Sequence, residues 1–158
     1  MRRTGIALIT LTLALSLTAC GAGFNASTRN FKQVSDGVEG SISTDSNNIK
    51  VVNVLIIETT EGAGVLVGTV VNSLPAEDAL LGVAINGVVA TVTGKTSLVQ
   101  NEPVTFEGEV ANAKAVVPAL NAKAGSNVQV TMFFANAGEI TLTALVRFQS
   151  DRYAGVTA

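Results

Sequence analysis

Residue types that commonly carry enzymatic chemistry are scarce in this sequence. It contains no histidine and a single cysteine, Cys20. A serine, threonine or cysteine nucleophile needs a neighbouring base that accepts its proton near neutral pH, and histidine is the usual base. Paired carboxylates remain as candidates for acid–base work. Three pairs lie close in sequence: Glu58 with Glu61, Glu77 with Asp78, and Glu107 with Glu109. Because no such pair can be assigned a raised pKa from sequence, we expect a protein that is not an enzyme.

Glu107 and Glu109 are the most suggestive of these pairs. Residues two apart on a strand point to the same face, so both carboxylates could reach one hard cation such as Ca²⁺. That ion takes about six to eight oxygen ligands, and two carboxylates fall far short of this number. A solvated strand face is therefore the favoured interpretation, and we expect neither a metal site nor a cofactor.

The first 19 residues have the three zones of a secretory signal peptide. Arg2 and Arg3 supply a positive start, residues 5–17 are predominantly apolar, and small residues precede Cys20. The apolar run is shorter than the roughly 20 residues that a membrane-spanning helix needs. The pattern therefore predicts a cleaved signal in place of a permanent anchor helix.

Cys20 stands in the stretch Leu17-Thr18-Ala19-Cys20, which resembles the lipobox of bacterial lipoproteins. The resemblance implies that lipid is attached to the Cys20 thiol and that cleavage occurs ahead of it. Two acyl chains suffice for stable attachment, so the membrane is the first expected partner and an envelope protein is the second. The predicted location is the extracytoplasmic face of the cell membrane. The alternative is an ordinary signal peptide whose cleavage leaves a free thiol near Cys20.

The charge of the mature chain argues against two other kinds of partner. Without Arg2 and Arg3 the sequence retains 8 basic residues against 12 acidic ones, a side-chain charge of −4 that is spread without blocks. Nucleic acids and anionic lipid head groups both attract clustered lysine and arginine. We therefore expect no nucleic acid partner and attachment to the membrane through the lipid alone.

From Ile49 onward, short runs of β-branched residues alternate with turn residues, and no stretch has a helical period. The pattern predicts strands at 50–58, 64–72, 80–85, 88–93, 104–109, 113–117, 127–135 and 139–148. Seven or eight strands indicate an all-β domain, which we assign to an immunoglobulin-like antiparallel β-sandwich over residues 49–149. Residues 20–48 are rich in Gly, Ser, Asn and Thr and are predicted as the lipidated cysteine and a flexible tether. Residues 150–158 form a C-terminal tail.

Two hairpins are predicted within this domain. Asn86-Gly87 suits the positive backbone angles of a type I′ turn between two strands. The last two strands alternate, and Ala137-Gly138 connects them. One apolar stripe is formed by Val128, Val130, Met132 and Phe134, and the other by Ile140, Leu142, Ala144, Val146 and Phe148. Each stripe is expected to face the core and a second sheet.

Residues 127–142, with Ala137-Gly138-Glu139 between the strands, resemble the closing hairpin of the periplasmic PCu(A)C copper-chaperone family. Upstream, Val70-Val71-Asn72-Ser73 and residues 78–83, which follow the pattern D-x-L-x-G-V, resemble two further family strands. Together with the lipobox, the chain is similar to small actinobacterial lipoproteins of the LpqE type, divergent relatives of those chaperones.

The resemblance implies copper ligands that this sequence does not supply. The family uses methionine and histidine, which suit Cu(I) and Cu(II). Where the family carries a late His-x-Met, this chain has approximately Ala113 to Val117. Of the two methionines, Met1 is lost with the signal, and Met132 lies on an apolar stripe, where a core role is expected. The leading hypothesis is therefore a non-enzymatic, lipid-anchored binding or structural domain of the cell envelope. The alternative is a copper-handling or assembly accessory protein that has lost the ligands.

Overall fold

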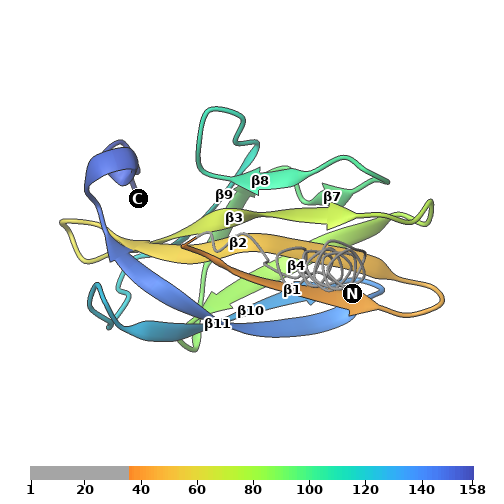
Figure 1. The fold of residues 1–158 in the computed structure, drawn as a ribbon, viewed down its shortest axis with the longest axis horizontal. Coiled ribbons are helices and arrows are strands. Elements are labelled where there is room, and N and C mark those ends of the chain that lie inside the picture. The colour runs from red at the N-terminus through yellow and green to blue at the C-terminus, as the bar shows by residue number, and fades with distance from the viewer. Residues whose placement is uncertain (1–35) are drawn as a thin grey trace, which may run out of the picture. The chain divides into compact units, whose positions relative to one another are not determined.

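The computed structural model describes residues 36–158, and these form β-strands with one short 3-10 helix and no α-helix (Figure 1). The signal peptide, Cys20 and residues 20–35 of the predicted tether lie outside the described residues. The strands are β1 (Val38–Ser43), β2 (Asn48–Glu58), β3 (Gly64–Asn72), β4 (Asp78–Ile85), β5 (Val88–Val89), β6 (Thr91–Gly94), β7 (Ser97–Leu98), β8 (Val104–Phe106), β9 (Ala113–Val117), β10 (Asn127–Phe134) and β11 (Gly138–Phe148).

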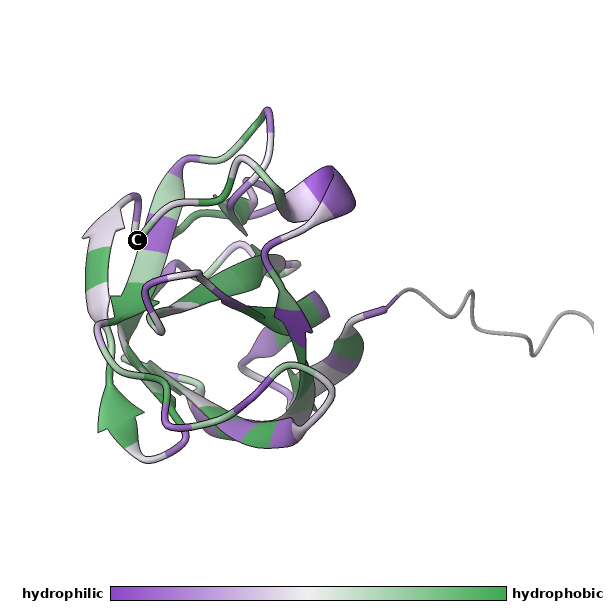
Figure 2. Cartoon of the chain, turned by 90° about the vertical axis from the view of Figure 1, so that its left-hand side faces the viewer, coloured by the Kyte–Doolittle hydropathy of each residue, from purple (hydrophilic) through white to green (hydrophobic). Residues whose placement is uncertain are grey.

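The strands follow the order β5-β4-β10-β11-β2-β3-β8-β9-β6, with β1 added beside β2 and β7 beside β4. Most neighbours are antiparallel, but β11 pairs with β2 in parallel through Val146–Ile56 to Phe148–Glu58. This pairing connects the β4-β10-β11 layer with the β2-β3-β8-β9 layer, so the hydrogen-bonded path folds around one interior (Figure 2). The prediction of an all-β sandwich is confirmed.

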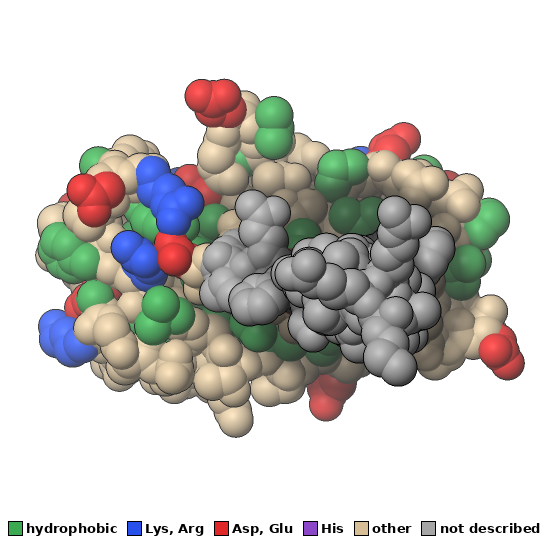
Figure 3. Space-filling model, viewed as in Figure 1, with side chains coloured by type: hydrophobic (Ala, Val, Ile, Leu, Met, Phe, Trp, Pro, Cys, Tyr) green, Lys and Arg blue, Asp and Glu red, His purple; other side chains and the backbone are tan. Residues whose placement is uncertain are grey.

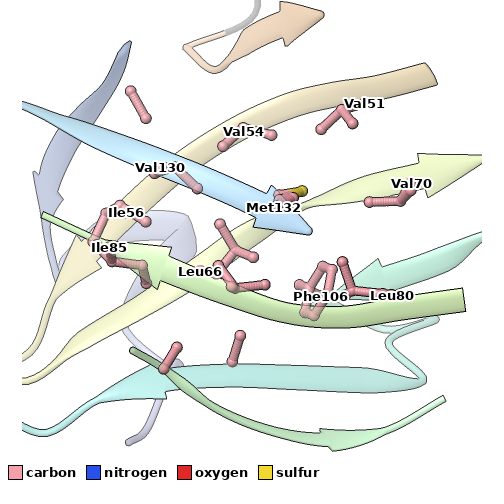
Figure 4. Packing of buried hydrophobic residues seen from close by; sticks show 14 of the residues in the cluster. Val51, Val54, Ile56, Leu66, Val70, Leu80, Ile85, Phe106, Val130 and Met132 are labelled. Atoms are coloured by element: carbon pink, nitrogen blue, oxygen red, sulfur yellow. The ribbon is translucent and has the colours of Figure 1, made fainter. Parts of the chain in front are cut away.

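The interior is filled by aliphatic side chains from both layers. Leu66 of β3, Ile85 of β4 and Met132 of β10 are fully buried and point into the same space as Phe106 (Figure 4). β-Branched side chains dominate this main core because they pack well on a pleated surface. Met132 occupies the core role that its position on an apolar stripe predicted.

β2 and β3 are apolar on both faces because both faces are covered. One face contributes Val54 and Ile56 to the main core, while Leu55 and Ile57 belong to a second buried cluster on the other side. A bulge at Asn53, whose φ is 55°, changes the register of β2 just before this stretch. The second cluster is completed by Val65, Val67 and Val156, with Val116 and Tyr153 packed against it.

Both predicted hairpins are present. Asn86 and Gly87 have φ values of 52° and 79°, as a type I′ turn requires, and Ile85 pairs with Val88. β10 and β11 pair in register from Asn127–Leu145 to Phe134–Gly138. Along β11 the predicted apolar face holds except at Phe148, which is 48% exposed because the main core ends at Val146.

Two element predictions need correction, and one short strand was missed. The predicted strand 88–93 is two strands: β5 pairs with β4, and β6 pairs with β9 in the other layer. Ala90 makes the transition, and its N–H donates to the carbonyl of Val83. The predicted strand 104–109 ends at Phe106, because Glu107 and Gly108 both have positive φ. β7 was not predicted, since two residues carry too little periodic signal.

The predicted tether also contains a strand. β1 lies within residues 20–48 and pairs antiparallel with β2 from Val38–Val54 to Ser43–Asn48. Val38 and Ile42 pack against the main core, whereas Glu39 and Ser41 are exposed. Two large apolar residues in a Gly/Ser-rich context gave little indication of a strand. The pairing partner is the first part of β2, which β11 leaves unpaired because it reaches only Ile56 to Glu58.

Candidate functional site

The structure separates the carboxylates that sequence had placed together. Glu107 and Glu109 do not share a strand face, because the chain turns at Glu107 (φ 61°) and Gly108 (φ 106°). Glu109 is exposed, whereas the side chain of Glu107 is only 18% exposed and lies 3.6 Å from the ammonium of Lys114. The expectation of a solvated strand face is therefore wrong for Glu107.

The Glu58–Glu61 pair is also divided by its surroundings. Glu61 is exposed, but Glu58 is buried at the end of β2. The N–H of Ala124 donates to Oε2 of Glu58 at 2.7 Å, and Nζ of Lys123 lies 3.3 Å from Oε1. The hydrogen bond from Ala124 lowers the pKa of Glu58, assisted by Lys123 and opposed by burial. A carboxylate held ionised in this way connects the 121–126 loop to β2.

Asp78 has a structural role that the sequence analysis did not identify. Its Oδ1 accepts the N–H of Asn136 and its Oδ2 accepts the N–H of Ala137, each at 2.9 Å. Asp78 is buried, while the neighbouring Glu77 is exposed. The two motifs that resemble the chaperone family, D-x-L-x-G-V and the Ala-Gly-Glu turn, are thus joined by this carboxylate. The resemblance of both motifs to one family was the only sign in the sequence that they are related. Their spacing along the chain could not show that they lie in contact.

The positions implied by the family resemblance do not form a metal site. The residues in place of His-x-Met form β9, in which Ala113, Ala115 and Val117 are buried in the main core. Met132 is fully buried and contributes no exposed sulfur. Within residues 36–158 no group of three or more His, Cys, Asp or Glu residues could hold a metal ion. Residues 36–158 therefore expose none of the histidine, cysteine or methionine side chains that copper prefers.

A pocket of about 340 Å³ lies where the C-terminal segment crosses the β2–β3 layer. We call it the C-terminal pocket and define it by its lining: Val67, Glu107, Gly108, Arg152, Tyr153, Gly155 and Val156. Val67 and Val156 belong to the second buried cluster. Figure 3 shows acidic and basic side chains close together on the left, at the end where the C-terminal segment lies in Figure 1.

The segment that forms this pocket is held in place by specific contacts. Gln149 accepts the N–H of Thr60 at 3.1 Å and donates to the carbonyl of Val156 at 2.6 Å. The 3-10 helix at Asp151–Tyr153 follows, and Arg152 forms an ion pair with Asp36. The predicted tail 150–158 is therefore a packed part of the domain.

No helix among residues 36–158 is both long enough and apolar enough to cross a membrane.

Comparisons with known proteins identify the fold. No protein-family model and no curated protein matches the sequence. Among solved structures, the apo PCuAC domain from PmoF1 superposes with a TM-score of 0.59 at 16% identity, covering 70% of this chain and 99% of that one. The copper-bound PCuAC domain from PmoF2 gives 0.56 at 21% identity, covering 69% and 98%. The apo PmoF2 domain gives 0.53 at 20% identity, covering 71% and 98%. The described domain therefore has the fold of PCuAC domains.

Proposed function

We propose that this chain is a lipid-anchored accessory protein in extracytoplasmic copper handling, and that it acts on a copper-binding partner without holding the metal itself. The observation that carries the proposal is the fold, which matches PCuAC domains, one of them copper-bound, over nearly their whole length. The sequence contributes the predicted lipid on Cys20.

The composition of the chain explains why the proposed role is that of an accessory. Transfer of copper between chaperones needs exposed methionine, cysteine or histidine on the donor. This chain has no histidine, its methionine in the domain is buried, and its one cysteine is predicted to carry lipid. A partner must then supply the ligands, while this domain supplies recognition or positioning.

A deletion strain tests the role in the cell. We expect loss of the gene to lower the copper content and activity of a copper-dependent oxidase in the envelope. Added copper and re-expression of the full chain should each restore that activity, whereas re-expression of Cys20→Ser should restore it only partly. Unchanged oxidase copper content in the deletion strain, under copper limitation, would contradict the proposal.

A titration tests the claim that the chain holds no copper. Cu(I) and Cu(II) are titrated into the full chain in detergent against a competing chelator. We expect no binding at micromolar metal. Binding at or below that concentration would replace the accessory role with that of a copper carrier.

The second candidate is the hypothesis favoured by sequence, a non-enzymatic envelope domain that binds a partner unrelated to copper. The buried pairing of Asp78 with the β10–β11 turn and the apolar core are equally compatible with it. The two candidates separate in the deletion strain: envelope defects with normal oxidase copper content would favour the second.

A further inference from the structure

The C-terminal pocket contains a carboxylate with unused binding capacity. The side chain of Glu107 is 18% exposed, and its only polar partner among the described residues is Lys114 at 3.6 Å, beyond ordinary hydrogen-bond length. By contrast, Glu58, beside a second hollow of about 430 Å³, already accepts the N–H of Ala124. Glu107 can therefore accept a donor from a ligand, whereas Glu58 is occupied by the protein.

The backbone at Glu107 supplies a second, independent indication. Its φ of 61° is a conformation that disfavours residues with a Cβ atom, and glycine would fit there without strain. Strained non-glycine residues are found preferentially at binding and catalytic sites, where the side chain is needed in that place. The turn thus presents a carboxylate to the pocket at a cost in stability.

Arg152 provides the opposite charge on the same pocket. Its guanidinium pairs with Asp36 through Nη2 and lies 5.2 Å from the centre of the Tyr153 ring, and its side chain remains 67% exposed. A guanidinium has several N–H donors, so one ion pair leaves others for a carboxylate.

The rest of the lining is apolar or small. Val67 and Val156 contribute apolar surface, and Tyr153 adds an aromatic ring. A Cβ atom built on Gly155 meets nothing within 4 Å, so the backbone there leaves open space. The volume of about 340 Å³ suits a small molecule of amino-acid or dipeptide size.

We infer that the C-terminal pocket binds a zwitterionic small molecule with an apolar side chain, of the amino-acid or dipeptide class. Glu107 accepts hydrogen bonds from the ammonium group of the ligand, and Arg152 donates to its carboxylate. Val67 and Val156 contact its apolar side chain. This inference does not rest on the proposed role in copper handling.

Binding of L-phenylalanine and L-leucyl-L-leucine to the full chain in detergent tests the inference, with NMR and calorimetry as the measurements. We expect saturable binding of at least one of them. Phenethylamine and 3-phenylpropionate each lack one charge of phenylalanine and should bind at least about tenfold more weakly, because charge-assisted hydrogen bonds are lost. The amide signals of Gly108 and Gly155 should shift on binding.

Three variants assign the contacts. Glu107→Gln should weaken phenylalanine binding about tenfold and leave 3-phenylpropionate unchanged, because only the ammonium contact is removed. Gly155→Leu should fill the pocket and reduce binding of every probe. The matched control is Gly82→Leu, since Gly82 also has open space at its Cβ but does not line the pocket.

Three outcomes would overturn the inference. The first is the absence of saturable binding for both zwitterions up to their solubility limits. The second is binding that shifts amides elsewhere in the domain, and the third is equally strong binding of the two singly charged analogues. Mapping the amide shifts on the unaltered protein locates the bound ligand even if Gly155→Leu does not fold.

Discussion

The carboxylate of Asp78, at the start of β4, accepts the backbone N–H of Ala137 at 2.9 Å across 59 residues of sequence. The same carboxylate accepts the N–H of Asn136. β4 and β10 are neighbours in the sheet, so the start of one strand meets the turn that follows the other. A single buried side chain therefore connects the start of β4 to the turn between β10 and β11.

Replacing Asp78 should destabilise the domain strongly. Asp78→Ala removes the acceptor of three backbone N–H groups, those of Ala79, Asn136 and Ala137, and hydrogen bonds to a charged group are worth about 1.5–3 kcal/mol each. We expect a loss of about 3 kcal/mol in the free energy of unfolding, measured by urea denaturation. Glu77→Ala is the control, because Glu77 is exposed and offers only its backbone carbonyl to Asn136. A loss below about 1 kcal/mol for Asp78→Ala would show that the turn stands without it.

Glu58 should make stability depend on acid pH. Since its pKa is lowered in the folded state, its contribution is fully present above the ordinary glutamate value of 4.5 and is lost as pH falls through the folded value. Urea denaturation between about pH 6 and about pH 3 measures this loss. Glu58→Gln should flatten that part of the profile, whereas Glu61→Gln, at an exposed position in the following turn, should not. Identical profiles for Glu58→Gln and the unaltered protein would contradict the assignment.

The C-terminal segment should stabilise the domain by covering the second buried cluster. Val156→Ala removes part of this cover over Leu55 and Val67, and such truncations of buried side chains cost about 1–2 kcal/mol. Increased fluorescence of a hydrophobic dye should accompany the loss of stability. Val110→Ala is the matched control, since Val110 is 77% exposed. Equal effects of the two substitutions would show that the segment contributes no cover.

Lipid on Cys20 remains a prediction from the sequence and has a direct test. Mass spectrometry of the native protein should show a chain that begins at Cys20 and carries diacylglycerol on its sulfur. Cys20→Ser should move the protein from the membrane fraction to the soluble extracytoplasmic fraction. An unmodified thiol in the native protein would contradict the lipidation and with it the predicted location.

The β-strands of the core were predictable because their side chains repeat the environment that the sheet provides. β3 and β9 have the predicted bounds, and the Asn86-Gly87 turn has the predicted backbone angles. In these segments the alternation of apolar and polar residues and the turn residues depend only on neighbouring positions, so the sequence is enough to predict the strands and the turn. β1 differs, because its few apolar residues become a strand only beside β2.

The candidate functional residues were likewise predictable only in part. Composition alone removed histidine, and with it the usual nucleophile–base pairs and one of the two copper ligand types of the family, whereas burial of Met132 in the core removed the other from the surface. Glu107 and Arg152 stand 45 positions apart and carry no shared motif, yet both line one pocket. Contacts between distant segments determine which charged side chains are paired, which line a pocket and which hold a turn. Only the tertiary structure decided these roles, because the sequence does not show which segments meet.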